Sequence, residues 1–370
     1  MKKALLFRLI FIFILIVGVS QCKISRFIVY NFADITDYKI FPERQLRCGE
    51  KKFSFPKAKL PNVLPYTFSS EKYTSFEQCL EKNKTVAFLV IRNDSIQYEH
   101  YFRGYDTTSI VASFSMAKSI TSILIGCAID DGFIKSVNEP VTNYIPELKE
   151  NGFEKVTIEH LLQMTSGIDF KESYYNPLGD AATIYYGRDL EGFIKKIKLK
   201  RPPGTQFEYT SGSPQILGLV LRNALKGKTI TEYLQEKIWS PIGMEYDASW
   251  SLDKQKNGLE KTFCCINARA RDFAKIGRLY LNNGRWDSIQ VVSSEWVERS
   301  TTIDTLNGSA SYYQYQWWIP SASGDYMAEG ILGQFIYVNP NKNLIIVRLG
   351  KKYGKVNWVS CFRKIAEAYK

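Results

Sequence analysis

The sequence predicts an α+β fold in which one antiparallel sheet, built from strands near both ends of the chain, is flanked by helices and interrupted by a helical insertion. Two hairpin patterns predict the sheet. In 85–104, TVAFLVIRNDSIQYEHYFRG, an apolar run and an alternating run flank Asn93-Asp94. In 335–349, FIYVNPNKNLIIVRL, two apolar runs flank a second turn. Since hairpin strands pair antiparallel, we expect an antiparallel sheet assembled from both ends.

Helical periodicity dominates the region between these hairpins. Apolar residues at spacings of three and four indicate a helix over 116–130. Over 156–167, Thr157 is placed to cap a second helix and Gly167 to end it. Further helices are expected at 181–196, 213–226, 229–240, 267–283 and 356–370, and further strands at 313–319 and 325–331.

Length and composition indicate a folded domain with an appended N-terminus. The 370 residues suit one large domain with an insertion, or two packed subdomains. We expect an N-terminal extension over 23–74, irregular over 23–60, and a main domain over 75–370, with a helical subdomain at about 133–285. The formal charge is +12, but no dense Lys/Arg tract or nucleic-acid-binding signature accompanies it, so we expect no nucleic-acid partner.

Residues 1–22, MKKALLFRLIFIFILIVGVSQC, have the charged start and apolar run of an export signal. Cys22 follows Val19-Ser20-Gln21, an order that looks like a bacterial lipoprotein signal, although Gln21 replaces the usual small residue. We therefore expect a protein of the cell envelope, held at the membrane through a lipid on Cys22. An uncleaved anchor and soluble export are the alternatives.

Ser115-Met116-Ala117-Lys118 is an S-x-x-K motif where an irregular segment enters the predicted helix. A serine and a lysine three residues apart share one helix face, so the amine can reach the hydroxyl. Free N–H groups at the helix start favour developing negative charge. The motif alone is weak, because a capping serine and a surface lysine give the same pattern.

Tyr209-Thr210-Ser211 supports a catalytic interpretation, because a tyrosine and two hydroxyl residues precede an apolar helix behind the rigid turn Pro202-Pro203-Gly204. With these motifs the chain resembles the serine β-lactamase and penicillin-binding-protein superfamily, in its class C/esterase-like branch. Within that branch it is most similar to 6-aminohexanoate-dimer hydrolase-type proteins. The matching stretches are SFSMAKSITSILIG, VTIEHLLQMTSGIDF, PPGTQFEYTSG, NARARDFAKIGRLYLNNGRW, SSEWV, YQWW and AEGILGQFIYVNP.

The resemblance implies an antiparallel sheet flanked by helices, a helical subdomain and a site in the cleft between them. It implies that Ser115 is the nucleophile, that Lys118 takes its proton, and that Tyr209 passes a proton to the leaving group. Ser211 would orient Lys118 or the substrate. The backbone N–H groups of Ser115 and Ile331, beside Gly330, would form the oxyanion hole. No metal or cofactor is implied, and the expected substrate is a small amide, ester or peptide.

The third family motif, K-T-G or H-T-G, aligns here with Ala328-Glu329-Gly330. The cation that would hold a β-lactam or peptide carboxylate is missing and an acidic residue stands in the motif, which argues against efficient β-lactam hydrolysis. Two alternatives to a small-amide or ester hydrolase stay open. One is a non-catalytic or slowly acylating envelope protein, and the other is a D-alanyl carboxypeptidase.

Aromatic residues are dense around the expected site. Tyr174, Tyr175 and Tyr186 are candidates for a mobile lid, and Tyr315 or Trp317 is a candidate for an acyl pocket. Only two histidines occur and no G-x-S-x-G motif is present, so a Ser-His-Asp hydrolase has no support. Nothing in the sequence pairs the seven cysteines.

Overall fold

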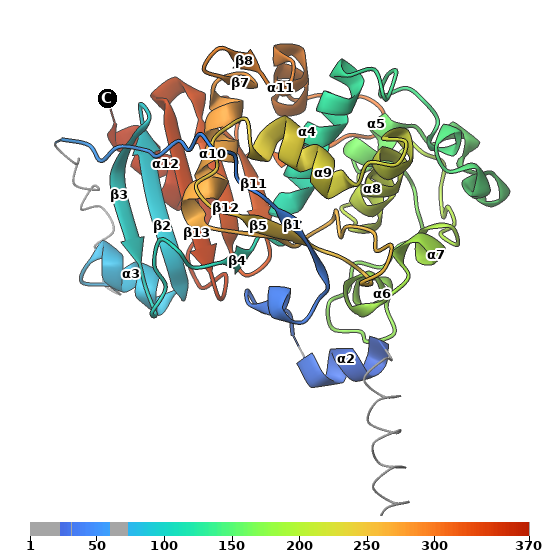
Figure 1. Ribbon diagram of the computed structural model, residues 1–370, viewed down its shortest axis with the longest axis horizontal. Coiled ribbons are helices and arrows are strands. Elements are labelled where there is room, and N and C mark those ends of the chain that lie inside the picture. Colours follow the sequence, from blue (N-terminus) through green and yellow to red (C-terminus); the bar gives the residue numbers. More distant parts are fainter. Residues whose placement is uncertain (1–22, 31, 60–72, 370) are drawn as a thin grey trace, which may run out of the picture.

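A large antiparallel sheet forms one side of the molecule (Figure 1). The computed structural model describes residues 23–30, 32–59 and 73–369. The sheet has seven strands in the order β3-β2-β13-β12-β11-β10-β9. These are β2 (Thr85–Arg92), β3 (Ser95–Tyr101), β9 (Tyr313–Gln314), β10 (Trp317–Trp318), β11 (Tyr326–Gly330), β12 (Gln334–Asn339) and β13 (Leu344–Gly350). Because β2 pairs with β13, the prediction of one antiparallel sheet from both ends of the chain is confirmed.

The turn predicted at Asn93-Asp94 is confirmed, but the segment 313–319 folds differently from its prediction. Asn93 and Asp94 have φ of 50° and 56°, as both central residues of a type I′ turn require. The single strand expected at 313–319 is wrong. Tyr315 and Gln316 also adopt positive φ and fold the segment into the small hairpin of β9 and β10. Neither residue type signals such a turn.

Alternating side chains give the sheet two apolar faces. Ile336 and Val338 face a core shared with α4 (Met116–Asp130) and α10 (Ala270–Leu281). Phe335 and Tyr337 face a second core, shared with α3 (Phe76–Lys82) and α12 (Trp358–Ala368). The sheet is therefore a middle layer with α4, which carries the S-x-x-K motif, against one face.

A second sheet links the N-terminal extension to the main domain. Its order is β1-β5-β6-β4, with β1 (Glu43–Leu46), β5 (Ala248–Ser251), β6 (Ile266–Ala268) and β4 (Val111–Ala112). The expectation that the extension lacks regular structure is wrong, because it supplies β1, the helix α2 (Lys23–Tyr30) and the short helix η1 (Asp37–Lys39). β4 leads directly into the segment that carries Ser115.

The remaining helices gather mostly on the side away from β3 (Figure 1). They are α5 (Ile158–Leu162), α6 (Asp180–Tyr186), α7 (Leu190–Ile194), α8 (Gly212–Ala224), α9 (Ile230–Leu234) and α11 (Ser294–Thr301). Shorter turns are η3 (Val141–Asn143), η4 (Pro146–Asn151), η5 (Phe153–Lys155), the π-helical η6 (Gln235–Trp239) and η7 (Pro340–Lys342). β7 (Arg285–Trp286) and β8 (Ile289–Gln290) form a small separate hairpin. α10 lies within 133–285 but packs against β12 and β13.

Several predicted helices are shorter than expected. Thr157 caps α5 as predicted, but the helix ends at Leu162. Met164, at φ 58°, and the bond from Thr165 N to His160 O close it in a Schellman motif ahead of Gly167. The helix at 181–196 is split at Gly187 into α6 and α7, and the start of 267–283 belongs to β6.

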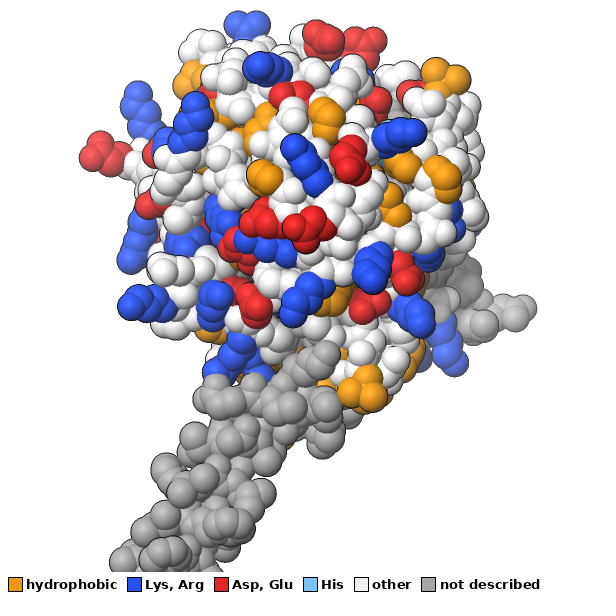
Figure 2. Space-filling model, turned by 90° about the vertical axis from the view of Figure 1, so that its right-hand side faces the viewer, with side chains coloured by type: hydrophobic (Ala, Val, Ile, Leu, Met, Phe, Trp, Pro, Cys, Tyr) orange, Lys and Arg blue, Asp and Glu red, His pale blue; other side chains and the backbone are white. Residues whose placement is uncertain are grey.

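Basic and acidic side chains intermingle over the face of the molecule drawn in Figure 2. Among the described residues, no helix is both long and apolar enough to cross a membrane. The predicted export signal at 1–22 and the lipid attachment site Cys22 lie outside the described residues.

Candidate active site

The first turn of α4 brings the S-x-x-K side chains together. Ser115 is the N-cap residue and Lys118 lies one turn later, so their side chains share a face. Lys118 Nζ lies 2.9 Å from Ser115 Oγ. Ser115 is 9% exposed and Lys118 1% exposed. The two groups therefore meet largely out of contact with water.

The backbone before Ser115 is held in an uncommon conformation. Phe114 has φ 44°, in the left-handed region that side-chain-bearing residues rarely enter. Ser113 donates its N–H to Ile266 O over 2.8 Å, and its Oγ accepts from Ile266 N over 3.0 Å. These bonds to β6 fix the segment as it enters α4. Strain of this kind persists where the surroundings over-determine a local geometry.

Lys118 has two further polar contacts. Its Nζ lies 2.9 Å from Phe263 O and 3.2 Å from Ser211 Oγ. Burial lowers the pKa of Lys118 to about 8, although the carboxylate of Glu172 acts in the opposite direction. A neutral amine, the form that can accept a proton, is therefore accessible near neutral pH.

The partners of Lys118 determine where its lone pair points. Ser211 Oγ donates its only proton to Glu172 Oε1 over 2.6 Å, so it must accept from Lys118. The Phe263 carbonyl can only accept. A neutral Lys118 thus commits both of its N–H bonds to these two oxygens, and its lone pair faces Ser115 Oγ. This is the orientation needed to take the serine proton.

Tyr209 lies beside the same pair. Its hydroxyl is close enough to Ser115 for the serine side chain to act on its pKa, and Lys118 Nζ lies 5.1 Å from its ring centroid. Burial raises the pKa of Tyr209, which keeps the phenol protonated and able to donate. The ring contacts Tyr313 and Trp318, with centroids 5.9 and 5.5 Å away.

The end of β11 approaches the backbone around Ser115. A Cβ added to Gly330 would lie 2.5 Å from Ser113 O and 3.1 Å from Ser115 N, so only glycine fits. Within the described residues, the backbone N–H groups of Ser115 and Ile331 donate to no hydrogen bond. Two unused amides, that of Ser115 and the one that follows Gly330 at the end of β11, match the donor set of an oxyanion hole.

Glu329 is a half-buried carboxyl next to Gly330. Burial raises its pKa to about 7. It has no hydrogen-bond or ion-pair partner among the described residues, and it is close enough to Tyr209 to raise that pKa as well. The position that the family pattern fills with a cation-containing motif thus carries a group that becomes anionic near neutral pH.

The lid candidates lie in different environments. Tyr174 donates to Glu172 Oε1 over 2.5 Å and so belongs to the Ser211 network. Tyr175 is 79% exposed and packs on Phe32. Tyr186 is 3% exposed and packs on Phe41 and Tyr185, a core position that does not fit a lid.

The two residues expected in an acyl pocket are core residues. Tyr315 and Trp317 are both fully buried, and Trp317 stacks on Tyr280 with a centroid distance of 4.3 Å. The acyl-pocket expectation is therefore wrong for both. The half-buried neighbour Trp318 contacts Tyr209 instead.

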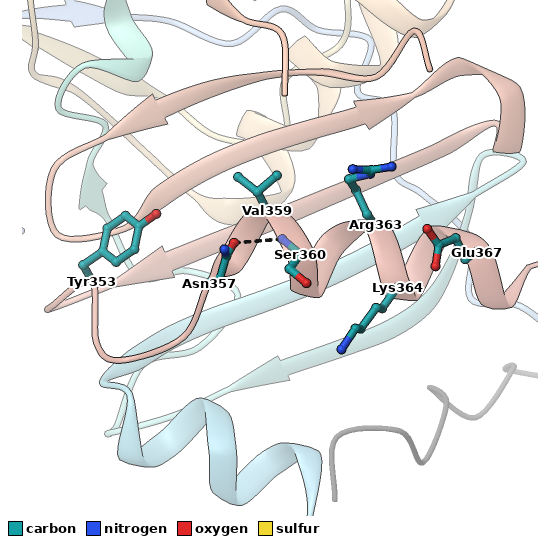
Figure 3. A pocket seen from close by; sticks show the side chains of 7 residues that line it. All are labelled: Tyr353, Asn357, Val359, Ser360, Arg363, Lys364 and Glu367. Atoms are coloured by element: carbon teal, nitrogen blue, oxygen red, sulfur yellow. Dashed lines mark hydrogen bonds between the residues drawn. The ribbon is translucent and has the colours of Figure 1, made fainter. Parts of the chain in front are cut away.

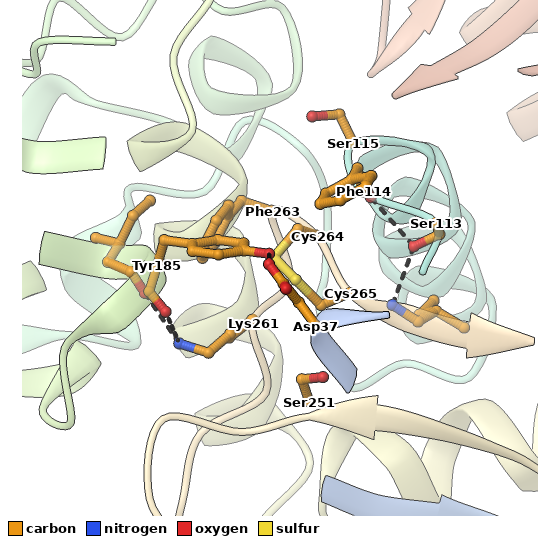
Figure 4. The surroundings of a disulfide bond; sticks show 12 residues. Asp37, Ser113, Phe114, Ser115, Tyr185, Ser251, Lys261, Phe263, Cys264 and Cys265 are labelled. Atoms are coloured by element: carbon orange, nitrogen blue, oxygen red, sulfur yellow. Dashed lines mark hydrogen bonds between the residues drawn. A yellow bond between two sulfur atoms is a disulfide. The ribbon is translucent and has the colours of Figure 1, made fainter. Parts of the chain in front are cut away.

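Sequence reasoning missed three contributors to this site: Glu172, the carbonyl of Phe263 and a disulfide between Cys264 and Cys265. Figure 4 shows the disulfide between the Phe263 and Ser113–Ser115 segments. Glu172 falls in an aromatic stretch with no motif, and a backbone carbonyl has no sequence signature. The adjacent cysteines were the one available signal.

A hollow on the outer face of α12 lies apart from these residues (Figure 3). It is lined by Tyr353, Asn357, Val359, Ser360, Arg363, Lys364 and Glu367. Because α12 and α4 cover opposite faces of the sheet, this hollow is separated from Ser115. No cluster of metal-ligating side chains occurs among the residues that the structure describes.

A known protein family matches most of the chain. The Beta-lactamase family model matches residues 75–370. The chain belongs to the Beta-lactamase family. The resemblance seen in the sequence motifs is thereby confirmed, and the fold is β-lactamase/transpeptidase-like, with antiparallel sheets flanked by helices.

Individual proteins and solved structures are also similar to this chain. The 6-aminohexanoate-dimer hydrolase of Paenarthrobacter ureafaciens is 28% identical over 294 residues, 74% of each chain. A solved structure described as a 6-aminohexanoate-dimer hydrolase from Bacillus anthracis has a TM-score of 0.79 at 27% identity, and the match covers 90% of this chain and 92% of that one. A family VIII carboxylesterase, 17% identical with a TM-score of 0.62, shares the fold.

Proposed function

We propose that this protein is a serine hydrolase that cleaves a small amide or ester through an acyl-enzyme on Ser115. One observation carries the proposal: the Nζ of buried Lys118 lies 2.9 Å from Ser115 Oγ, with its lone pair directed there by its other two partners. Activation of a serine by an adjacent base is a general route to covalent catalysis.

The proposed reaction has two half-reactions. Ser115 Oγ attacks the substrate carbonyl carbon while Lys118 takes its proton, and the N–H groups of Ser115 and Ile331 stabilise the oxyanion. Tyr209 then donates a proton to the departing amine or alcohol, and Lys118 restores it. In the second half-reaction, water attacks the acyl-enzyme and its proton returns to Ser115 through the same groups.

The substrate class is proposed from relatives and from charge. The name of the Paenarthrobacter relative indicates an amide dimer as its substrate, which supports a small linear amide here. An ionised Glu329 beside the site opposes a substrate carboxylate. We therefore place β-lactams and peptidoglycan stem peptides, whose carboxylate lies next to the scissile bond, below esters and amides that carry no carboxylate at that place.

The proposal is tested with Ser115→Ala and a serine-reactive fluorophosphonate. Wild type should gain one stoichiometric adduct, and Ser115→Ala should gain none while it loses roughly 10³–10⁶ in turnover with its thermal transition unchanged. Turnover retained by Ser115→Ala would refute the assignment. Absence of any wild-type adduct would favour a non-catalytic envelope protein. Release of D-alanine from muropeptides would favour a carboxypeptidase.

We also propose that the chain is exported and held at the membrane through Cys22, on the strength of residues 1–22 alone. Wild type should fractionate with membranes, whereas Cys22→Ser should be released into the soluble fraction. Equal partition of both proteins would contradict lipid attachment at this cysteine.

A further inference from the structure

A disulfide joins the adjacent residues Cys264 and Cys265, next to the candidate active site. Both are buried, 3% and 2% exposed, in the core beneath α4. Figure 4 shows them between Phe263 on one side and the Ser113–Ser115 segment on the other. The bond therefore lies inside the loop that supplies one of the contacts of Lys118.

This loop contacts the S-x-x-K region at both of its ends. Before the disulfide, Phe263 O accepts from Lys118 Nζ over 2.9 Å. After the disulfide, Ile266 exchanges two hydrogen bonds with Ser113. The two linked cysteines span the stretch between these contacts. A change in the backbone of Cys264 and Cys265 would thus move the Phe263 carbonyl relative to Lys118.

The backbone of this stretch is otherwise weakly determined by residue type. Cys265 has φ 73°, in the left-handed region that glycine adopts readily and that a residue with a Cβ rarely adopts. The bond between adjacent side chains closes a small ring through the intervening peptide, which restricts its torsions. Hydrogen bonds from Trp250 Nε1 to Cys264 O and from Ser251 N to Cys265 O hold the ring against β5.

We propose that the Cys264–Cys265 disulfide is a positioning element that holds the Phe263 carbonyl against Lys118, and that its reduction slows acylation of Ser115. This inference rests on the proposed function. In the reduction, a dithiol gives two electrons and two protons to the S–S bond. Two thiols form on Cys264 and Cys265, and the dithiol becomes a disulfide. Without the ring, Cys265 can leave positive φ and the Phe263 carbonyl can turn away.

Reduction should alter the pH profile of acylation as well as its rate. A carbonyl acceptor stabilises the ammonium form of Lys118, so its loss should lower the pKa of Lys118 and move the acidic limb to lower pH. In the oxidised protein the other titratable groups that face Lys118 are Glu172 and Tyr209, and the reduction alters neither. Reduction adds the thiols of Cys264 and Cys265, and the variant C264S/C265S, which has neither thiol, separates their titration from that of Lys118. A disulfide that only excluded water would behave oppositely, because hydration would raise this pKa towards its ordinary value.

The experiment measures fluorophosphonate labelling of Ser115 against pH in three states of the full chain: oxidised, dithiol-reduced, and the variant C264S/C265S. Intact mass verifies reduction by the gain of two hydrogen atoms. Misplacement of the base should slow labelling about tenfold or more in the reduced protein and in the variant. Reoxidation should restore the labelling rate of reduced wild type and should leave that of C264S/C265S unchanged. Cys361→Ser, which changes an equally buried cysteine of α12 on the other face of the sheet, is the matched control and should label like wild type.

Unchanged labelling after complete reduction would overturn the inference, and so would an acidic limb that moves to higher pH. Either result leaves the proposed function intact, because oxidised wild type would still label at Ser115. A failure of the proposed function differs from both, since no state of the protein would then label. Cys265→Gly, which keeps access to positive φ without the disulfide, should label faster than C264S/C265S.

Discussion

The Oγ of Ser211 lies 2.6 Å from Oε1 of Glu172, and the backbone N–H of Ser211 donates to Oε2 of the same carboxylate over 2.7 Å. This two-point contact fixes which way the Ser211 hydroxyl donates, and so fixes it as an acceptor for Lys118. Glu172 therefore influences Lys118 without touching it: it orients the Ser211 hydroxyl, and its charge acts on the Lys118 pKa.

Glu172→Gln should move the acidic limb of kcat/KM to lower pH by about one unit. The carboxylate of Glu172 raises the pKa of Lys118, so removing its charge favours the neutral amine at a lower pH. The glutamine oxygen can still accept from Ser211, which should leave the plateau rate within about threefold of wild type. A pH-rate profile on a neutral nitrophenyl ester measures both quantities.

Glu208→Gln is a suitable control, because Glu208 is adjacent to Tyr209 in sequence but pairs with Lys200 and Arg201 instead. Its profile should match wild type. If the acidic limb of kcat/KM lies at the same pH in Glu172→Gln as in wild type, the carboxylate does not influence the pKa of the group that produces this limb.

Lys118 should also give the protein a stability that rises with pH. The pKa of Lys118 is about 8 when folded and 10.5 in its ordinary state, so between these values the unfolded chain binds more protons than the native one. The free energy of unfolding of wild type should therefore gain about 2 kcal/mol relative to Lys118→Met between pH 7 and 9.5. Urea denaturation at the two pH values measures the difference. An equal pH dependence of both proteins would mean that Lys118 keeps its proton.

The sequence predicted the parts of the site that local pattern encodes, and missed the parts that depend on tertiary contact. Ser115 and Lys118 meet because a helix places residues three apart on one face, which periodicity alone predicts. Glu172 reaches Ser211 across 39 residues, and Phe263 O reaches Lys118 across 145. The hairpin turn at Asn93-Asp94 was predictable, because these residue types favour positive φ. Positive φ at Tyr315 and Gln316 is imposed by the surrounding core and has no such signal in the sequence.

Gly330→Ala should lower kcat by about 10²–10³, the usual effect of losing one oxyanion donor. The added Cβ would meet Ser113 O at 2.5 Å and Ser115 N at 3.1 Å, so β11 must move away and take the Ile331 amide with it. The φ of Gly330 is not positive, so alanine is sterically allowed by its own backbone. Circular dichroism should show an unchanged fold, and KM should change less than kcat. A full wild-type kcat would remove this strand end from the oxyanion site.

Glu329 should discriminate against anionic substrates in a pH-dependent way. Its pKa is about 7, so the side chain is mostly neutral at pH 6 and mostly charged at pH 8. The test uses two nitrophenyl esters that differ only in a terminal carboxylate or amide. The ratio of kcat/KM for the anionic ester to kcat/KM for the neutral ester should fall as pH rises through this range. Glu329→Gln should abolish that change and raise kcat/KM for the anionic ester at pH 8 by about tenfold, or about 1.4 kcal/mol.

The neutral ester isolates the charge effect, because activation of Ser115 by Lys118 is common to both reactions and cancels in their ratio. Glu367→Gln, on the outer face of α12, changes the net charge equally without approaching Tyr209 and should leave the ratio unchanged. A ratio that is independent of pH in wild type would mean that the bound substrate does not come near Glu329. The carboxylate would then have to act on Tyr209, whose pKa it raises, and the Glu329→Gln change would appear equally in both esters.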